Sequence, residues 1–276
     1  MEKENGLKWI DPISEIKPVS YACPKCKRPL SITQNALHCI GCNRTYPVAG
    51  GIPDFVSDNL QARADPNYQW MTLWNLLAPM YESRLWYSFV LTLAGAGGSS
   101  LRSIANFISE TLEGVSGNVL DVACGPATYG RRIASPDRSV YGIDFSMGTL
   151  QQGMKNIGRE GISNIHLAQT RVEELPFENA VFDGAICAGS LHLFPDTVLA
   201  LREIARTLKA GAPLVVTTFV VGDSLAAHLV KARKNMHVFE LPELQQYLTE
   251  AGFEGFVVKQ DGTFITFSTR KAARHA

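Results

Sequence analysis

Four of the six cysteines in this 276-residue chain lie in two close pairs. They are Cys23 with Cys26 and Cys39 with Cys42, which gives the spacing C-x2-C-x12-C-x2-C. A two-residue spacer lets one tight turn present two thiolates to one ion, and two such turns complete the tetrahedron that zinc prefers. The pattern predicts a zinc site, with four unrelated buried cysteines or a redox pair as the alternative. Because four thiolates leave no open coordination position, the predicted zinc is structural.

A second group of chemically informative residues follows two apolar runs. Asp121 lies in the run Val119–Ala127, which ends in a turn of small residues, and Asp144 follows Asp121 by 23 residues. Small residues allow the backbone to approach a bound nucleoside, and a carboxylate accepts hydrogen bonds from both ribose hydroxyls. A nicotinamide enzyme is the competing interpretation. The turn lacks the pattern G-x-G-x-x-G, however, and a carboxylate after the first strand suits a cationic ligand better than a pyrophosphate.

Alternating helices and apolar strands are expected to position these residues. Because strands that alternate with helices indicate βαβ units, the sheet should be mostly parallel. The short turn Gln260-Asp261-Gly262 predicts an antiparallel last strand. The strands are predicted at 118–123, 139–143, 165–168, 185–188, 213–219, 256–259 and 264–269. The expected division is an extended lead-in at 1–20, a zinc ribbon at 21–56, a helical lid with a connecting helix at 66–115, and a nucleoside-binding domain at 116–276.

Several segments resemble, in the right order, the motifs of class I methyltransferases that use S-adenosylmethionine. Leu120–Gly125 resembles motif I and Gly142–Ser146 resembles motif II. Glu173–Phe177 with Val181–Asp183 is similar to the passage into motif IV, and Arg202–Gly211 to the helix and turn before the fifth strand. The resemblance covers about residues 68–270 and is closest to the ubiquinone/menaquinone-type, small-molecule branch. It implies a Rossmann-like, doubly wound α/β fold with a mostly parallel seven-stranded sheet.

The cysteine region carries a resemblance of its own. With Pro29-Leu30 and Tyr46–Pro53 around the cysteine pairs, it resembles the zinc ribbon of the activator subunit shared by several RNA and protein methyltransferases. It is also similar to the N-terminal zinc module of ribosomal RNA guanine methyltransferases. The basic residues of this end are a solvated surface or an RNA contact; they are Lys8, Lys25, Lys27, Arg28 and Arg44.

The methyltransferase resemblance also implies positions for the cofactor. Asp121, Ala123 and Gly125 would surround its methionine part, Asp144 would bind the ribose, and the segment Arg171-Val172 would lie beside the adenine. Arginine stands where the family usually has an aspartate that accepts from the adenine amino group, so that contact must come from the backbone or be lost. Ala123 and Ala127 stand where glycine is frequent. The remaining expected cofactor positions are Cys124, Phe145, Met147 and Ala188.

Two residues are candidates for the catalytic end of the site. His192 lies in Gly189–Phe194, a loop that faces the transferred methyl group in the family that it resembles. Its imidazole titrates near neutral pH and would serve acceptors that must lose a proton, while a histidine that only lines or braces the pocket is the equal alternative. Tyr81 resembles a tyrosine of the N-terminal lid in such enzymes. Core packing and ligand contact remain equally open for it.

Composition and charge limit the function classes. The first interpretation is an enzyme that transfers a methyl group to O, N or C of a small, aromatic or apolar metabolite. The second is an RNA base methyltransferase that presents rRNA or tRNA through the ribbon. The third is a non-catalytic binding module. Basic and acidic residues number 26 each, so no net field attracts a polyanion and RNA is disfavoured. With no 18-residue apolar run and no signal-like N-terminus, the expected compartment is the cytoplasm, without membrane contact. The ribbon is expected to contact its own catalytic domain or a partner protein.

Overall fold

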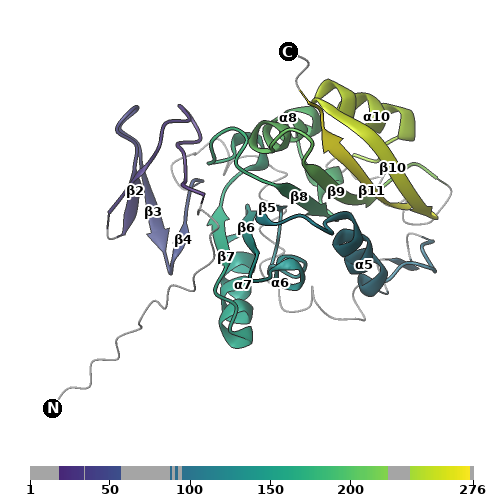
Figure 1. Cartoon of the computed structure of the whole chain (residues 1–276), viewed down its shortest axis with the longest axis horizontal. Helices are drawn as coiled ribbons and strands as arrows, with labels where there is room; N and C mark the ends of the chain where they lie inside the picture. The colour runs from purple at the N-terminus through teal and green to yellow at the C-terminus, as the bar shows by residue number, and fades with distance from the viewer. Residues whose placement is uncertain are drawn as a thin grey trace.

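The computed structural model describes residues 19–33, 35–56, 88, 91–92, 95–222 and 237–273. Within these ranges the strands form one small and one large sheet (Figure 1). The small sheet is antiparallel and has the order β1-β2-β3-β4. Its strands are β1 (Ser31–Ile32), β2 (Ala36–His38), β3 (Thr45–Ala49) and β4 (Ile52–Pro53).

The large sheet has seven strands in the order β10-β11-β9-β8-β5-β6-β7. Its parallel part consists of β5 (Gly117–Val122), β6 (Arg138–Asp144), β7 (Ile165–Gln169), β8 (Gly184–Ala188) and β9 (Pro213–Phe219). The last strand, β11 (Phe264–Lys271), is antiparallel to both β9 and β10 (Phe253–Asp261). The prediction of a mostly parallel seven-stranded sheet is confirmed. β10 is longer than the predicted 256–259, because an exposed edge strand shows little apolar alternation.

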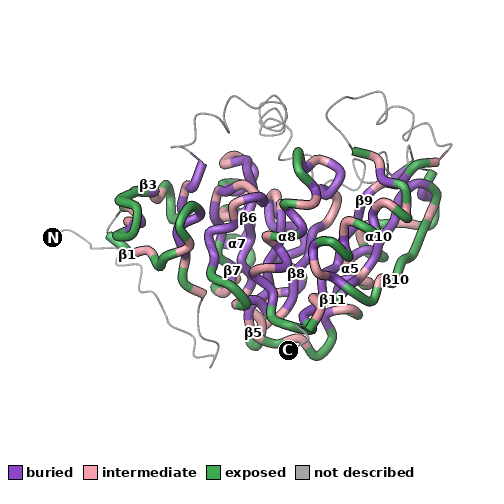
Figure 2. The backbone as a smooth tube through the Cα atoms, turned by 90° about the horizontal axis from the view of Figure 1, so that it is seen from above, coloured by how far each residue is buried: buried purple, intermediate pink, exposed green. Residues whose placement is uncertain are grey.

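Helices cover both faces of the large sheet (Figure 1). Buried residues of α5 (Leu101–Thr111), α6 (Gly130–Ile133) and α7 (Met147–Glu160) belong to one apolar cluster. Those of α8 (Thr197–Thr207) and α10 (Leu241–Glu250) belong to the other. β5 alternates between them, since Val119 joins the first cluster while Leu120 and Val122 join the second. As a result the parallel strands of the large sheet are mostly buried, whereas the edge strand β10 is largely exposed (Figure 2).

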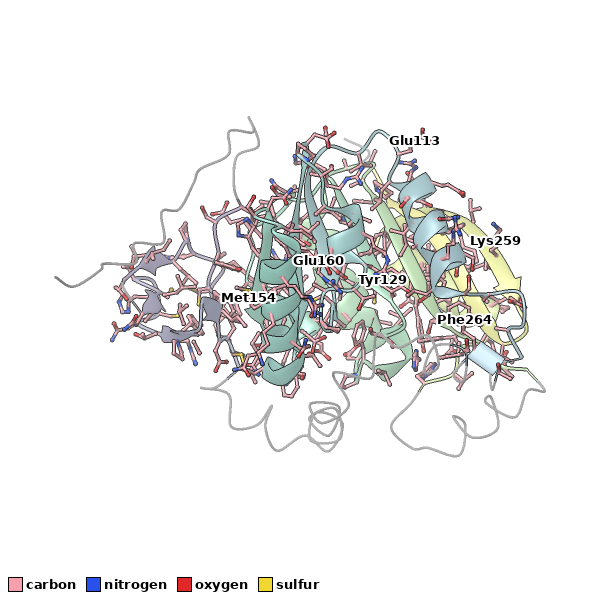
Figure 3. All side chains as sticks on the ribbon, turned by 90° about the horizontal axis from the view of Figure 1, so that it is seen from below. Glu113, Tyr129, Met154, Glu160, Lys259 and Phe264 are labelled. Carbon is pink, nitrogen blue, oxygen red and sulfur yellow. The ribbon has the colours of Figure 1, made fainter. Side chains whose placement is uncertain are left out.

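The small sheet lies beside β7, at the edge of the large sheet (Figure 1). Asp54 forms a parallel bridge with Gln169, the last residue of β7. Tyr21 stacks on Phe177 with ring centroids 5.5 Å apart. Cys23 and Phe177 are buried in the same apolar cluster, so the two sheets share one core. Met154 of α7 lies on the surface of that helix that faces the small sheet (Figure 3).

Some predicted elements fall outside the described residues. These are most of the lead-in, at 1–18, and residues 66–87 of the predicted lid. In the ranges that are described, no helix has both the length and the apolar character needed to cross a bilayer.

Candidate functional site

Three neighbouring parallel strands end at the same edge of the large sheet. Asp121 is the fifth residue of β5 and pairs with Ile186 of β8 on one side and Gly142 of β6 on the other. Asp144 ends β6, and Ala188 ends β8. Ligands of open α/β sheets bind where the carboxyl ends of the strands meet. The structure therefore brings these three predicted site residues to the edge where a ligand is expected.

The turn after β5 has an unusual backbone. Ala123, Gly125 and Ala127 have φ angles of 52°, 54° and 59°, in the left-handed region that favours glycine. Cys124, between the first two, donates its N–H to the carbonyl of Ile143 at 2.9 Å and so ties the turn to β6. A Cβ atom placed on Gly125 would meet nothing within 4 Å. The turn therefore leaves open space next to its backbone, where a nucleoside can approach.

Asp144 organises the residues around it. One carboxylate oxygen accepts the N–H of Gly125 at 2.8 Å and the other accepts the N–H of Ser146 at 2.8 Å. Burial raises the pKa of this carboxyl group above its usual range. The oxygen bonded to Ser146 also accepts from the hydroxyl of Thr149 at 3.4 Å. Because each carboxylate oxygen has two lone pairs, the oxygen bonded to Gly125 keeps one for a ligand hydroxyl.

Asp121 lies deeper, with 2% of its surface exposed. Its carboxylate accepts the N–H of Gly130 at 3.1 Å. Burial, with a smaller contribution from the nearby charge of Asp144, raises the pKa of Asp121 to about 8. Two carboxyl groups in one desolvated place make the edge favourable for a cation, which is the charge of the methionine end of S-adenosylmethionine.

The segment after β7 lies beside the end of β6, where Asp144 is found. Arg171 caps the short helix η2 (Val172–Glu174), and its guanidinium lies 3.5 Å from the carboxylate of Glu173. Thr170 donates its N–H to the carbonyl of Asp144 at 3.0 Å. Arg171 and Val172 therefore follow directly on a residue that is bonded to the end of β6. Phe145 and Met147, which follow Asp144, lie at the start of α7.

His192 lies in η3 (Leu191–Leu193), just after β8, and is only 4% exposed. Its Nδ1 atom is 3.3 Å from the hydroxyl of Thr218, and its ring packs edge-on against Phe219 at 4.9 Å. Burial lowers the pKa of His192 to about 4, so the ring is neutral at physiological pH. We did not predict the partner Thr218, although it is one of two threonines in the otherwise apolar run of β9. Tyr81, the other catalytic candidate, lies outside the described residues.

The four predicted metal ligands converge. The Sγ atoms of Cys23, Cys26, Cys39 and Cys42 all lie within 4.8 Å of one another. Two of the separations are 3.5 Å and 3.3 Å, close to the edge of about 3.8 Å that Zn–S bonds of about 2.3 Å give a tetrahedron. Burial disfavours the thiolate of Cys23, but hydrogen bonds, led by the one from Tyr46, outweigh it and lower its pKa to about 6. The donor set therefore fits zinc.

The two cysteine turns have the same local construction. Cys23 donates its N–H to the carbonyl of Arg28, and Cys39 donates to that of Arg44, each at 2.8 Å. His38, beside Cys39, stays out of the sulfur cluster, and its Nδ1 atom pairs with the hydroxyl of Thr45 at 3.1 Å.

A family model described as a methyltransferase domain matches residues 114–263, more than half of the chain. The chain belongs to this family. A second model, described as Trm112p-like protein, matches residues 22–51 and thus the cysteine region. The chain is therefore a methyltransferase with a Trm112-like zinc ribbon ahead of its catalytic domain, and S-adenosylmethionine is its methyl donor.

Two relatives show how far the likeness extends. An uncharacterized chloroplastic methyltransferase of Arabidopsis thaliana is 24% identical over 91% of this chain and 78% of its own length. A demethylmenaquinone methyltransferase of Listeria welshimeri is 36% identical, but over only 35% of this methyltransferase and 42% of the relative. The second likeness thus covers less than half of either protein.

Solved structures share the fold of the methyltransferase. The YcgJ protein of Bacillus subtilis superposes with a TM-score of 0.55 at 17% identity, covering 62% of this chain and 99% of that one. The [4+2]-cyclase SpnF superposes with a TM-score of 0.59 at 18% identity, covering 75% and 96%. The likeness to a cyclase illustrates that fold alone does not fix a reaction.

Proposed function

We propose that this methyltransferase acts on a small, apolar or aromatic metabolite. The observation that carries the proposal is a row of rings at the carboxyl edge of the sheet, formed by His192, Phe219 and Phe264. Phe219 ends β9 and lies 4.9 Å from the ring of His192 and 5.6 Å from that of Phe264. Aromatic side chains favour a flat apolar acceptor, which packs against their faces or edges. The local likeness to an enzyme named for demethylmenaquinone supports the same class of acceptor.

The cofactor residues keep the roles expected from the resemblance as part of this proposal. S-adenosylmethionine supplies a methyl group that its sulfonium already activates, so the chain has to align the donor and the acceptor. Asp121 favours the cationic end, the open backbone at Gly125 admits the nucleoside, and Asp144 accepts from the ribose. The backbone at Arg171 and Val172 lies beside the adenine. The remaining expected cofactor positions are Ala123, Cys124, Phe145, Met147 and Ala188.

His192 is proposed to brace the acceptor end as a neutral imidazole. A ring with a pKa of about 4 is unprotonated near neutral pH but is a weak base. Its contact with Thr218 holds the ring in place. Tyr81 stays a proposed contact of the cofactor or the acceptor.

We also propose that the four cysteines hold one structural zinc ion. In the proposed division the ribbon spans 21–56, the lid and connecting helix 66–115, and the catalytic domain 116–276. Elemental analysis of purified protein should give one zinc per chain, and the Cys26→Ser variant should lose it.

Methyl transfer from tritiated S-adenosylmethionine tests the acceptor class. The protein is offered a panel of quinols and phenols and, in parallel, total tRNA and rRNA. The proposal expects label in the organic extract of the first reaction, and the control Asp121→Asn should give none. Label in the RNA fraction alone would contradict it. The RNA alternative is weakened because Lys25 and Lys27 of the ribbon pair with Glu174 and Glu203 of the same chain.

A further inference from the structure

We propose that the ribbon positions the cofactor segment, defined as residues 169–177, through Lys27 and Glu203, so that metal loading of the four thiols sets the affinity for the cofactor. The inference rests on the proposed placement of Arg171 and Val172 beside the adenine. It adds a link between two sites that lie in different parts of the fold.

The ribbon holds both ends of the cofactor segment. At one end Phe55 donates its N–H to the carbonyl of Gln169 at 2.8 Å. At the other end Ala22 donates its N–H to the carbonyl of Pro176, also at 2.8 Å. Arg171 and Val172 lie between these two anchors, so the path of the backbone beside the adenine depends on where the ribbon lies.

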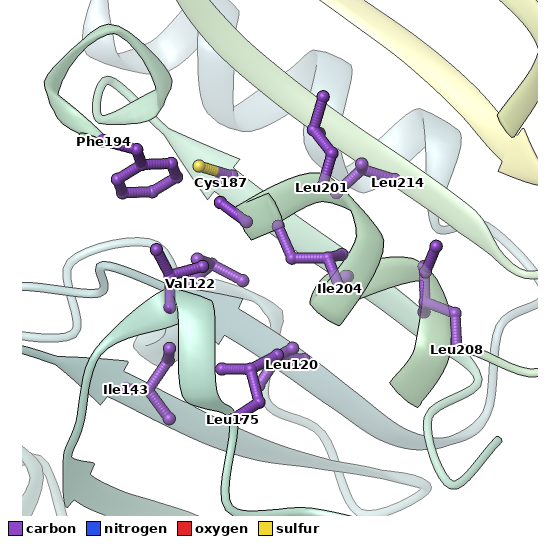
Figure 4. Packing of buried hydrophobic residues seen from close by; sticks show 14 of the residues in the cluster. Leu120, Val122, Ile143, Leu175, Cys187, Phe194, Leu201, Ile204, Leu208 and Leu214 are labelled. Atoms are coloured by element: carbon purple, nitrogen blue, oxygen red, sulfur yellow. The ribbon is translucent and has the colours of Figure 1, made fainter. Parts of the chain in front are cut away.

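Leu175 is the residue of the cofactor segment whose backbone both Lys27 and Glu203 contact. Its N–H donates to the carboxylate of Glu203 in α8 at 3.0 Å. Its carbonyl accepts from the ammonium of Lys27 at 3.1 Å and from the guanidinium of Arg206 at 3.2 Å. The side chain packs among Leu120 and residues of α8 in the shared core (Figure 4). Both backbone polar groups of Leu175 are thus held by charged side chains, and hydrogen bonds to charged groups are stronger than neutral ones.

Lys27 and Glu203 form a protected ion pair. Their charged atoms are 2.8 Å apart, with side-chain exposures of 33% and 12%. By contrast, Lys25 pairs with Glu174 at exposures of 40% and 32%, where water weakens the attraction. The pair of Lys27 and Glu203 is therefore the better shielded of the two, and it reaches the cofactor segment because both side chains also bond the backbone of Leu175.

The position of Lys27 depends on the first cysteine turn. Lys27 follows Cys26 directly and donates its N–H to the carbonyl of Cys23 at 2.8 Å. Its own φ of 58° is left-handed, a conformation that the turn imposes. A metal bound by all four cysteines would tie this turn to the second one, whereas without metal the turn depends on the backbone hydrogen bonds of Cys23 and Lys27. Loss of the metal should therefore release Lys27 from Leu175 and Glu203.

The segment passes the effect on to the ribose side. Gln169 donates its side-chain amide to the carbonyl of Phe145 at 2.8 Å, and Thr170 donates its N–H to the carbonyl of Asp144 at 3.0 Å. A shift of the cofactor segment therefore disturbs the adenine side directly and the ribose side through these two bonds. Lys27 and Glu203 are positioning residues, because neither is placed in contact with the cofactor.

The test compares full-length, zinc-loaded Lys27→Met with the wild type and with Arg44→Met, a matched loss of an exposed ribbon cation. Calorimetry with S-adenosylhomocysteine is run well below the unfolding temperature, with zinc content measured on the same samples. Lys27→Met should weaken binding roughly 10- to 100-fold, about the loss of one charge-assisted hydrogen bond. It should keep its zinc and its kcat at saturating cofactor, and hydrogen exchange should speed up in residues 170–177. Arg44→Met should match the wild type.

Zinc removal provides the second arm. Metal-free wild type should show the same loss of affinity as Lys27→Met, and metal-free Lys27→Met should show no further loss beyond about twofold. Multiplying losses would overturn the coupling, as would wild-type affinity in zinc-loaded Lys27→Met. If metal removal unfolds the chain, the single variants Lys27→Met and Glu203→Gln are compared with the double variant. The proposal expects the double variant to lose no more affinity for the cofactor than the weaker-binding single variant. Failure of the wild type itself to bind the nucleoside would refute the cofactor placement instead.

Discussion

At the scale of single residues, Asp121 determines how the site responds to pH. Its carboxyl group is buried beside Asp144 and has a pKa of about 8. The protein without cofactor therefore keeps a proton on Asp121 at neutral pH. A cation that binds there favours the carboxylate, so binding of S-adenosylmethionine should release a proton.

The affinity for the cofactor should therefore increase with pH. Below pH 8 each molecule that binds must first deprotonate Asp121, so the Kd should fall roughly tenfold between pH 6.5 and pH 8 and level off above it. Calorimetry in two buffers with different heats of ionisation would measure the released proton. Asp121→Asn should bind weakly at every pH, and a pH-independent Kd for the wild type would refute the role of Asp121.

The same carboxyl group should destabilise the cofactor-free protein at high pH. Its folded pKa, about 8, lies above the ordinary aspartate value of 3.8 that applies to the unfolded chain. Between these values the folded state holds a proton that the unfolded state releases, so the free energy of unfolding falls as the pH rises. Asp121→Asn removes this dependence, so its stability advantage over the wild type should grow by on the order of 3 kcal/mol between pH 5.5 and pH 9. Thermal unfolding at pH 5.5 and pH 9 measures it; an equal fall of Tm in both proteins would contradict it.

Single residues differ in how well the sequence predicts them. Asp121 and Asp144 could be singled out because each stands at the end of an apolar strand next to small residues. Glu203 could not, since a glutamate on an amphipathic helix is typical of a solvated surface. Two of its partners are distant along the chain: Lys27 is 176 residues away and Leu175 is 28 residues away. No local pattern contains that information, and the roles of the predicted cofactor residues remain predictions.

At the scale of elements, the turn after β5 shows how backbone conformation serves binding. Ala123 and Gly125 both have left-handed φ angles, but only Gly125 lacks the Cβ that this conformation penalises. Alanine at position 123 is therefore strained, and the family's frequent glycine there has a physical reason. The open space at Gly125 has a different consequence, because a side chain there would enter the volume proposed for the cofactor.

Exchanging these residues should separate stability from binding. Ala123→Gly relieves the strain and should stabilise the protein by up to about 1 kcal/mol, with little change in cofactor affinity. Gly125→Ala introduces the same strain and should cost about 1 kcal/mol of stability. Its methyl group should in addition weaken cofactor binding by more than tenfold. Denaturant unfolding and calorimetry measure the two effects; equal affinity in both variants would show that the cofactor does not approach Gly125.

Elements with strong local signals could be predicted. The parallel strands are buried on both faces and read as short apolar runs, so β5, β6 and β9 lie within one or two residues of their predicted ranges. The helix that follows the turn, α6 (Gly130–Ile133), is short and begins three residues after Ala127. The left-handed φ angle of Ala127 is incompatible with an α-helix, so the helix begins after it. The sequence does not reveal this angle, because alanine usually favours a helix.

At the scale of the whole molecule, the ribbon and the catalytic sheet share one apolar core. Leu37, Tyr46 and Phe55 of the ribbon are buried in the same cluster as Leu175 and Phe177. The sequence indicated a separate module from its two cysteine pairs, and it left two docking partners open: the chain's own catalytic domain and a partner protein. It could not choose between them, because the contacts join Tyr21 to Phe177 and Phe55 to Gln169, across more than a hundred residues.

The shared core predicts that zinc stabilises more than the ribbon. A separate ribbon would lose its structure alone, whereas a shared core makes the ribbon and the sheet unfold together. The zinc-loaded protein should therefore unfold in one transition, and Cys42→Ser should lower its Tm by roughly 5–15 °C, since metal binding contributes several kcal/mol to folding. Ile40→Ser changes the same turn at a residue that is 81% exposed and should keep both zinc and Tm. The contrary result is that the zinc-loaded protein unfolds in two transitions, and that Cys42→Ser abolishes the first and leaves the second unchanged. That result would mean that the ribbon folds independently of the catalytic domain.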